Sequence, residues 1–226
     1  MIRVYAESPF VLQLVLRQEH RATCDALVEI ARVGTIELVL PVVAFIEPLG
    51  TLRLRASKRQ ESSNAWRAQA RELARSDHQS YRQAAEALEN AILSTAQMTD
   101  EERRRLDDVT AQVGSVARLL SPSVADFRRA YALEQKGATG VDALAMALIV
   151  SDATTHAVDE HALLSLDEKS IPATITAELK ASGMKVFTKP DELRSWLRSK
   201  SIELSSSTSV APTAAADGTT GPDGAA

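Results

Sequence analysis

Four carboxylates of the chain occupy positions at which acidic side chains could share a cation. Glu7 follows a short apolar run, Glu47 lies in the helical stretch after a second run, Asp142 lies in the first turn of an apolar helix, and Asp167 follows a third run. Carboxylates that converge repel one another unless the charge is offset. Hard divalent cations with oxygen ligands, Mg²⁺ or Mn²⁺, offset it well and favour water activation and phosphoryl chemistry.

Each carboxylate also has a purely structural explanation. A carboxylate in a first helical turn, like Asp142 three residues after Thr139, is favoured by the helix dipole. Glu7 could cap a following helix, and Asp167 could belong to an ordinary polar turn. Glu47 is harder to explain in this way, because Val, Ala, Phe, Ile and Leu surround it and a buried carboxylate needs a partner.

The expected elements would bring these positions together. Apolar, β-prone runs predict strands over residues 2–6, 36–40, 162–166 and 184–187, and helical spacing predicts helices between them. This alternation is typical of an α/β domain with a mostly parallel sheet covered on both faces. Ligands of such sheets bind beyond the carboxyl ends of the strands, where Glu7 and Asp167 would lie.

Two segments stand apart from this domain, which we expect over residues 1–202. Residues 56–121 predict a helical insertion of two long helices, broken near residue 98 because Thr99 to Glu102 matches a capping box. The insertion is expected to be a solvated hairpin, with a substrate lid or a dimer arm as the alternatives. Residues 203–226 are rich in Ser, Thr, Ala and Gly, and predict a disordered low-complexity tail.

The motifs around the carboxylates, taken in order, resemble those of PIN-domain proteins. The stretches concerned are VYAESPFVL at residues 4–12, IELVLP at 36–41 with AFIEP at 44–48, GVDAL at 140–144, and LLSLD at 163–167. The resemblance implies a three-layer PIN-like sandwich and a metal-dependent ribonuclease, often the toxin of a toxin–antitoxin pair. It also implies that Glu7, Glu47, Asp142 and Asp167 are the catalytic metal ligands, with Ser8 and Ser165 as hydrogen-bonding neighbours.

The chain departs from the family pattern at three places. The first acidic residue is usually Asp and here is Glu7, Pro9 stands where Asn is common, and the segment between Glu47 and Asp142 is longer than in compact toxins. These departures leave open a second function, in which the domain is a catalytically impaired binding or regulatory module that acts through the helical insertion.

A basic run follows Glu47. Arg53, Arg55, Lys58 and Arg59 stand in a stretch without acids from residue 51 to 60, and are either a phosphate-contacting patch or a solvated helix face. The chain as a whole is acidic, with a net charge of −4, so any contact to nucleic acid must be local.

The sequence therefore predicts metal-dependent hydrolysis of RNA, without separating RNA from DNA or a small phosphate ester. Expected partners are RNA, an antitoxin protein and, through the insertion, a second copy of the chain. We expect a cytoplasmic protein, because the single cysteine suggests a reducing compartment and neither a membrane-spanning run nor a signal peptide is evident.

Overall fold

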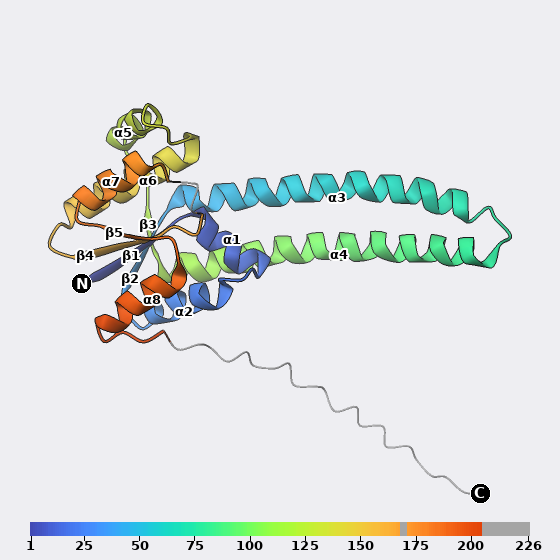
Figure 1. Ribbon diagram of the computed structural model, residues 1–226, viewed down its shortest axis with the longest axis horizontal. Helices are drawn as coiled ribbons and strands as arrows, with labels where there is room; N and C mark the ends of the chain where they lie inside the picture. Colours follow the sequence, from blue (N-terminus) through green and yellow to red (C-terminus); the bar gives the residue numbers. More distant parts are fainter. Residues whose placement is uncertain (168–170, 205–226) are drawn as a thin grey trace, which may run out of the picture.

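A computed structural model describes residues 1–167 and 171–204 of the chain. These residues form a five-stranded parallel sheet of β1 (Ile2–Ala6), β2 (Glu37–Pro41), β3 (Arg118–Leu120), β4 (Glu160–Leu164) and β5 (Lys185–Phe187), in the order β3-β2-β1-β4-β5 (Figure 1). The predicted α/β class with a parallel sheet is confirmed. The short strand β3 was not predicted from the sequence.

Successive residues of the strands enter two separate hydrophobic cores, as the alternation of a strand requires. Val4 and Ala6 lie in one core and Tyr5 in the other. The first core is covered by α1 (Ser8–Leu16), α2 (Arg21–Arg32) and α8 (Pro190–Ser199), and the second by α5 (Val124–Glu134), α6 (Gly140–Thr155) and α7 (Ala173–Ala181). Helices on both faces are compatible with the expected three-layer arrangement.

Two long helices leave this body as a hairpin, which we call the arm. After a 3₁₀ turn, η1 (Val42–Phe45), the arm consists of α3 (Ile46–Leu73) and α4 (Gln79–Val116), joined by residues 74–78. At about 1.5 Å per residue the two helices are about 42 and 57 Å long. They run side by side and project away from the sheet (Figure 1).

The predicted helix break near residue 98 is wrong, since α4 passes through it without interruption. The Thr99 hydroxyl donates a hydrogen bond to the carbonyl of Thr95, one turn earlier, as it does inside a helix and not at a cap. The continuous helix is explained by a seam of buried and half-buried positions that are alternately three and four residues apart, the spacing of a coiled coil. The seam positions are Leu52, Ala56, Arg59, Ser63, Trp66, Ala70 and Leu73 on α3, and Ala85, Leu88, Ile92, Thr95, Thr99, Glu102, Leu106, Val109 and Val113 on α4.

A polar layer interrupts this seam. The guanidinium of Arg59 donates to both carboxylate oxygens of Glu102, at 2.8 and 2.7 Å, and to the hydroxyl of Thr99 at 3.2 Å. The hydrogen bonds from Arg59, and then the charges of Arg59 and Arg55, lower the pKa of Glu102. A paired polar group in an otherwise packed seam fixes the register of the two helices, because any slip would leave the ions unpaired.

Across the sheet from the arm, a network of charges ties α6 to the strands. Tyr5 donates a hydrogen bond of 2.8 Å to Asp152, which also forms an ion pair with Arg118, and Arg118 reaches Glu37 on β2. Burial, and then the hydrogen bond to Asp152, raises the pKa of the Tyr5 hydroxyl.

At the end of the described chain, Leu204 is buried in the first core and its carbonyl accepts a hydrogen bond from Arg194. Leu204 thus packs on the domain two residues after position 202. The rest of the predicted tail, residues 205–226, lies outside the described residues.

Cys24 is buried in the first core. Within the described parts of the chain, every helix is too short or too polar to cross a bilayer.

Candidate functional site

Glu7 lies where the first strand ends and the first helix begins. Its side chain makes no capping hydrogen bond to α1, so the structural explanation for Glu7 as a helix cap does not hold. The parallel pairing of Ala6 with Leu164 places Glu7 beside Ser165, one residue beyond each strand. Glu7 is only 3% exposed, and its Oε1 atom has no hydrogen-bond partner among the described residues. A buried carboxylate oxygen without a donor is costly unless a cation or a proton compensates it.

The electrostatics of Glu7 connect it to the other predicted carboxylates. Burial raises the pKa of Glu7 from 4.5 to about 7, and a hydrogen bond with the Ser165 side chain opposes this rise. The charges of Asp142, Glu47 and Asp167 raise the pKa of Glu7 further. All four carboxylates therefore lie close enough for their charges to interact, although they come from four separate elements.

Asp142 and Glu47 face each other across a groove between α6 and α3. Ile46, Glu47, Gly50, Thr51 and Leu54 on α3, with Thr139, Gly140, Val141 and Asp142 on α6, line this cavity of about 500 Å³, which we call the groove. Asp142 accepts a hydrogen bond of 3.0 Å from the Thr139 hydroxyl, which fixes one of its oxygens at the start of α6. Gly50 and Gly140 both line the groove, and a Cβ at either position would meet only open space; the positive φ of 35° is what favours glycine at position 140.

Glu47 is exposed, contrary to its expected burial in an apolar stretch. The neighbouring apolar residues Ile46 and Leu49 are themselves 56% and 41% exposed; Ile46 lines the groove, and Leu49 lines a separate pocket between α3 and α4. Asp167 is exposed as well, whereas Ser8 and Ser165 are buried beside Glu7. The backbone carbonyl of Asp167 accepts a hydrogen bond of 3.3 Å from Ser165, so the residue after β4 is held against the site.

The four carboxylates are grouped but do not form a closed metal cage. Within residues 1–167 and 171–204, no three His, Cys, Asp or Glu side chains are arranged tightly enough to hold an ion as they stand. The donor set is nevertheless all carboxylate, and it includes the buried Oε1 of Glu7, which has no hydrogen-bond partner among the described residues. These two features fit a hard divalent cation, provided that the exposed side chains of Glu47 and Asp167 rotate toward it.

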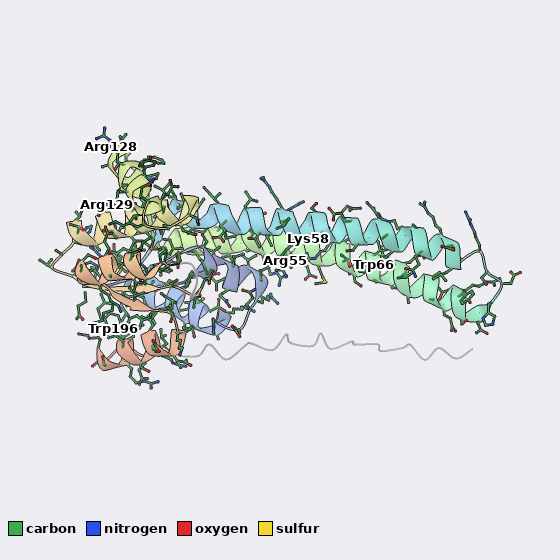
Figure 2. All side chains as sticks on the ribbon, turned by 45° about the horizontal axis from the view of Figure 1, so that its top comes forward. Arg55, Lys58, Trp66, Arg128, Arg129 and Trp196 are labelled. Carbon is green, nitrogen blue, oxygen red and sulfur yellow. The ribbon has the colours of Figure 1, made fainter. Side chains whose placement is uncertain are left out.

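The predicted basic run divides into two kinds of residue. Arg59 is held by Glu102 in the seam of the arm, so its guanidinium already has a structural role. Arg55 is half-buried and Lys58 is exposed on α3, beyond the groove residue Leu54 (Figure 2). Arg53 is exposed and lines a separate pocket between α3 and α4. Contact of Arg53, Arg55 and Lys58 with RNA stays a prediction.

The sequence did not predict Thr139 as a partner of the Asp142 side chain, nor the apolar rim of Ile46, Leu54 and Val141 around the groove. The only indication was the spacing of Thr139 and Asp142 at the start of the helix; the Thr139 hydroxyl bonds to the Asp142 side chain and makes no capping hydrogen bond to the backbone of α6. Comparison with known proteins adds no assignment, since no protein-family model, no curated protein and no solved structure matches this chain.

Proposed function

We propose that the protein is a metal-dependent endoribonuclease with a PIN-like active site at the carboxyl end of its sheet. The observation that carries this proposal is the buried Oε1 of Glu7 without a hydrogen-bond partner, on a carboxylate that feels the charges of Asp142, Glu47 and Asp167, together with the open groove that Glu47 and Asp142 line. Above a pH of about 7 the Glu7 carboxyl group is ionised and this oxygen has no compensating donor in the protein, whereas a bound cation would compensate it.

Glu7 and Asp142 would hold Mg²⁺ or Mn²⁺ from the floor of the site, and Glu47 and Asp167 would complete the ligand set from its rim. When bound, such an ion supplies a more acidic water and stabilises negative charge on a phosphoryl group. Thr139 keeps the carboxylate of Asp142 oriented through its 3.0 Å hydrogen bond. Ser165, one residue beyond β4, forms a hydrogen bond with the side chain of Glu7.

The groove would receive the RNA backbone. Its apolar rim offers contact to a ribose or base, while Arg55 and Lys58, after the groove residue Leu54 on α3, and Arg53 at the side of α3 that faces α4, would neutralise phosphates. The charge of the protein as a whole is −4, so this local basic strip is needed to bring a polyanion to an acidic site.

The test is Mn²⁺-dependent cleavage of a mixed RNA pool by the native protein and by Asp142→Asn. We expect cleavage that requires the metal and is lost in the variant, and Asp100→Asn, at an exposed carboxylate on the arm, should cleave normally. A single-stranded DNA pool and a small phosphodiester, assayed in parallel, would distinguish RNA from the other phosphodiesters. Absence of cleavage, together with no thermal stabilisation by Mn²⁺, would overturn the proposal.

A second function is favoured by the arm. A hairpin of about 42 and 57 Å that projects from the body offers a docking surface independent of the carboxylates. In this case the protein would be a binding or regulatory module, and its partner would dissociate on changes to the arm but not on Asp142→Asn.

A further inference from the structure

The outer side of α5 exposes large apolar residues along one stripe. Val124, Phe127 and Tyr131 are 71%, 55% and 66% exposed, and they stand at positions i, i+3 and i+7 of the helix. The opposite side of the same helix is buried at Ala130 and Leu133, which pack in the second core. The stripe is therefore not the packing face of α5, and its exposure needs another explanation.

A basic residue lies within this stripe. Arg128, one turn after Val124, is exposed and points away from the body (Figure 2). The ion pairs found within residues 1–167 and 171–204 do not include Arg128. The acid nearest in sequence, Asp126, is buried and bonded to Ser123 and Ser151, so it does not offset this charge at the surface. We call Val124, Phe127, Arg128 and Tyr131 the α5 face.

We propose that the α5 face is an exosite that binds unpaired bases of RNA outside the groove, an inference that rests on the proposed function. Exposed aromatic rings with an adjacent cation form the platform on which single-stranded nucleic acid stacks, because every base has a π-face and every linkage carries a charge. The chain has only 4 Phe, 3 Tyr and 2 Trp, so two aromatic rings more than half exposed on one helix face are a concentrated feature.

The position of α5 relative to the groove supports a nucleic-acid ligand. α5 packs on the outside of α6, and its carboxyl end turns back toward the start of α6 (Figure 1). The turn is tight, since the backbone amide of Ala138 donates a hydrogen bond of 3.2 Å to the carbonyl of Leu133. The groove residues Thr139 and Asp142 come directly after this turn in the sequence. The carboxyl end of the α5 face is thereby joined to the groove residues by a short turn, and a strand that continues past Tyr131 would have only this turn to cross.

A second copy of the chain is a poorer occupant of this face. A symmetric contact between two α5 helices would bring the two Arg128 side chains close to each other in the middle of an apolar stripe, which is unfavourable for like charges. A polyanion has no such cost, and it neutralises Arg128 as it binds.

The test measures binding without cleavage. Anisotropy of a labelled oligouridylate of about 20 nucleotides, titrated in EDTA with the full chain, reports affinity alone. The double variant Phe127→Ala/Tyr131→Ala should bind about tenfold or more weakly, and Arg128→Ala should lower the slope of log affinity against log salt by about one. Tyr81→Ala, at a ring 52% exposed on the arm, and Arg104→Ala, at an exposed arginine, are the matched controls and should bind as the native protein does.

Two further measurements separate stacking from a general loss of charge or fold. Binding of inorganic polyphosphate should be unchanged in the double variant, and Tyr131→Trp should keep its affinity for the oligonucleotide and show fluorescence quenching on binding. Equal affinity of the native protein and the double variant would overturn the exosite and leave the face to a protein partner. Loss of binding in the double variant of a protein that cleaves nothing would instead support the exosite and overturn the nuclease.

Discussion

Replacing Glu7 with Gln should stabilise the protein at neutral and alkaline pH. The native carboxyl group is 3% exposed, and its pKa is raised from 4.5 to about 7 by burial and then by the charges of Asp142, Glu47 and Asp167. Gln occupies the same volume, can still accept the hydrogen bond from Ser165, and carries no charge at any pH. The substitution therefore removes the cost of a buried anion with little change in packing.

The size and pH range of the effect follow from linkage. The unfolded chain releases this proton near pH 4.5 and the folded chain near pH 7, so between these values the folded state binds more protons and its stability falls as pH rises. A difference of about 2.5 pKa units, from 4.5 to about 7, corresponds to about 3–3.5 kcal/mol at about 1.4 kcal/mol per unit. We expect Glu7→Gln to have little effect at pH 4 and to gain about 3 kcal/mol at pH 8, a rise in Tm of about 6–12 °C for a chain of this size.

The assay is urea unfolding of the native protein and Glu7→Gln from pH 4 to pH 8 in EDTA. Glu134→Gln, at an exposed carboxylate on α5, is the control and should follow the native curve throughout. Adding Mn²⁺ should stabilise the native protein more than Glu7→Gln, since the bound ion favours the ionised carboxylate. Parallel stability curves for the native protein and Glu7→Gln would refute the reasoning, and an equal response to Mn²⁺ would remove Glu7 from the ligand set.

Three other changes test the rest of the structure. Glu102→Gln should destabilise the protein by about 1–3 kcal/mol, because Arg59 stays in the seam of the arm without its partner charge. Urea unfolding followed by circular dichroism would measure this, and an unchanged unfolding midpoint would mean that the polar layer is solvated. Tyr5→Phe should cost about 1–2 kcal/mol in the same unfolding experiment, since Asp152 loses a buried donor, and a neutral result would show that Arg118 alone satisfies it. Leu204→Ala should cost about 2–3 kcal/mol by thermal unfolding, whereas no change in Tm would contradict its packing in the first core.

The sheet could be predicted because its strands are short, apolar and bounded by turn residues. The predicted strand at residues 2–6 coincides with β1, and the strand expected at 36–40 lies within one residue of β2. β3 was missed because its three residues, Arg118–Leu120, follow a long helix directly and show no alternation of their own. Pairing with the end of β2 makes this segment a strand, and such long-range contacts are not visible in a local pattern.

The site could be predicted only in part, for a related reason. Glu7 and Ser165 follow from the topology, since residues just beyond parallel strands meet at one edge of the sheet. The exposure of Glu47 could not be inferred, because apolar neighbours indicate burial only when another element covers them, and here they border the groove. Likewise, a local match to a capping box at Thr99 was overridden by the seam, whose effect depends on α3 lying alongside α4.

The regular spacing of the seam means that the arm can change its length in fixed steps of seven residues per helix. Because buried positions recur every seven residues on both α3 and α4, a deletion or duplication of seven residues in each helix, at the same level of the hairpin, restores every pairing above and below it. A change of any other size would rotate one helix about its axis and turn Arg59 or Glu102 out of the seam. The reach of this protein can therefore lengthen or shorten in steps of about 10 Å while the residues at the base of α3, including Glu47, keep their orientation toward the groove.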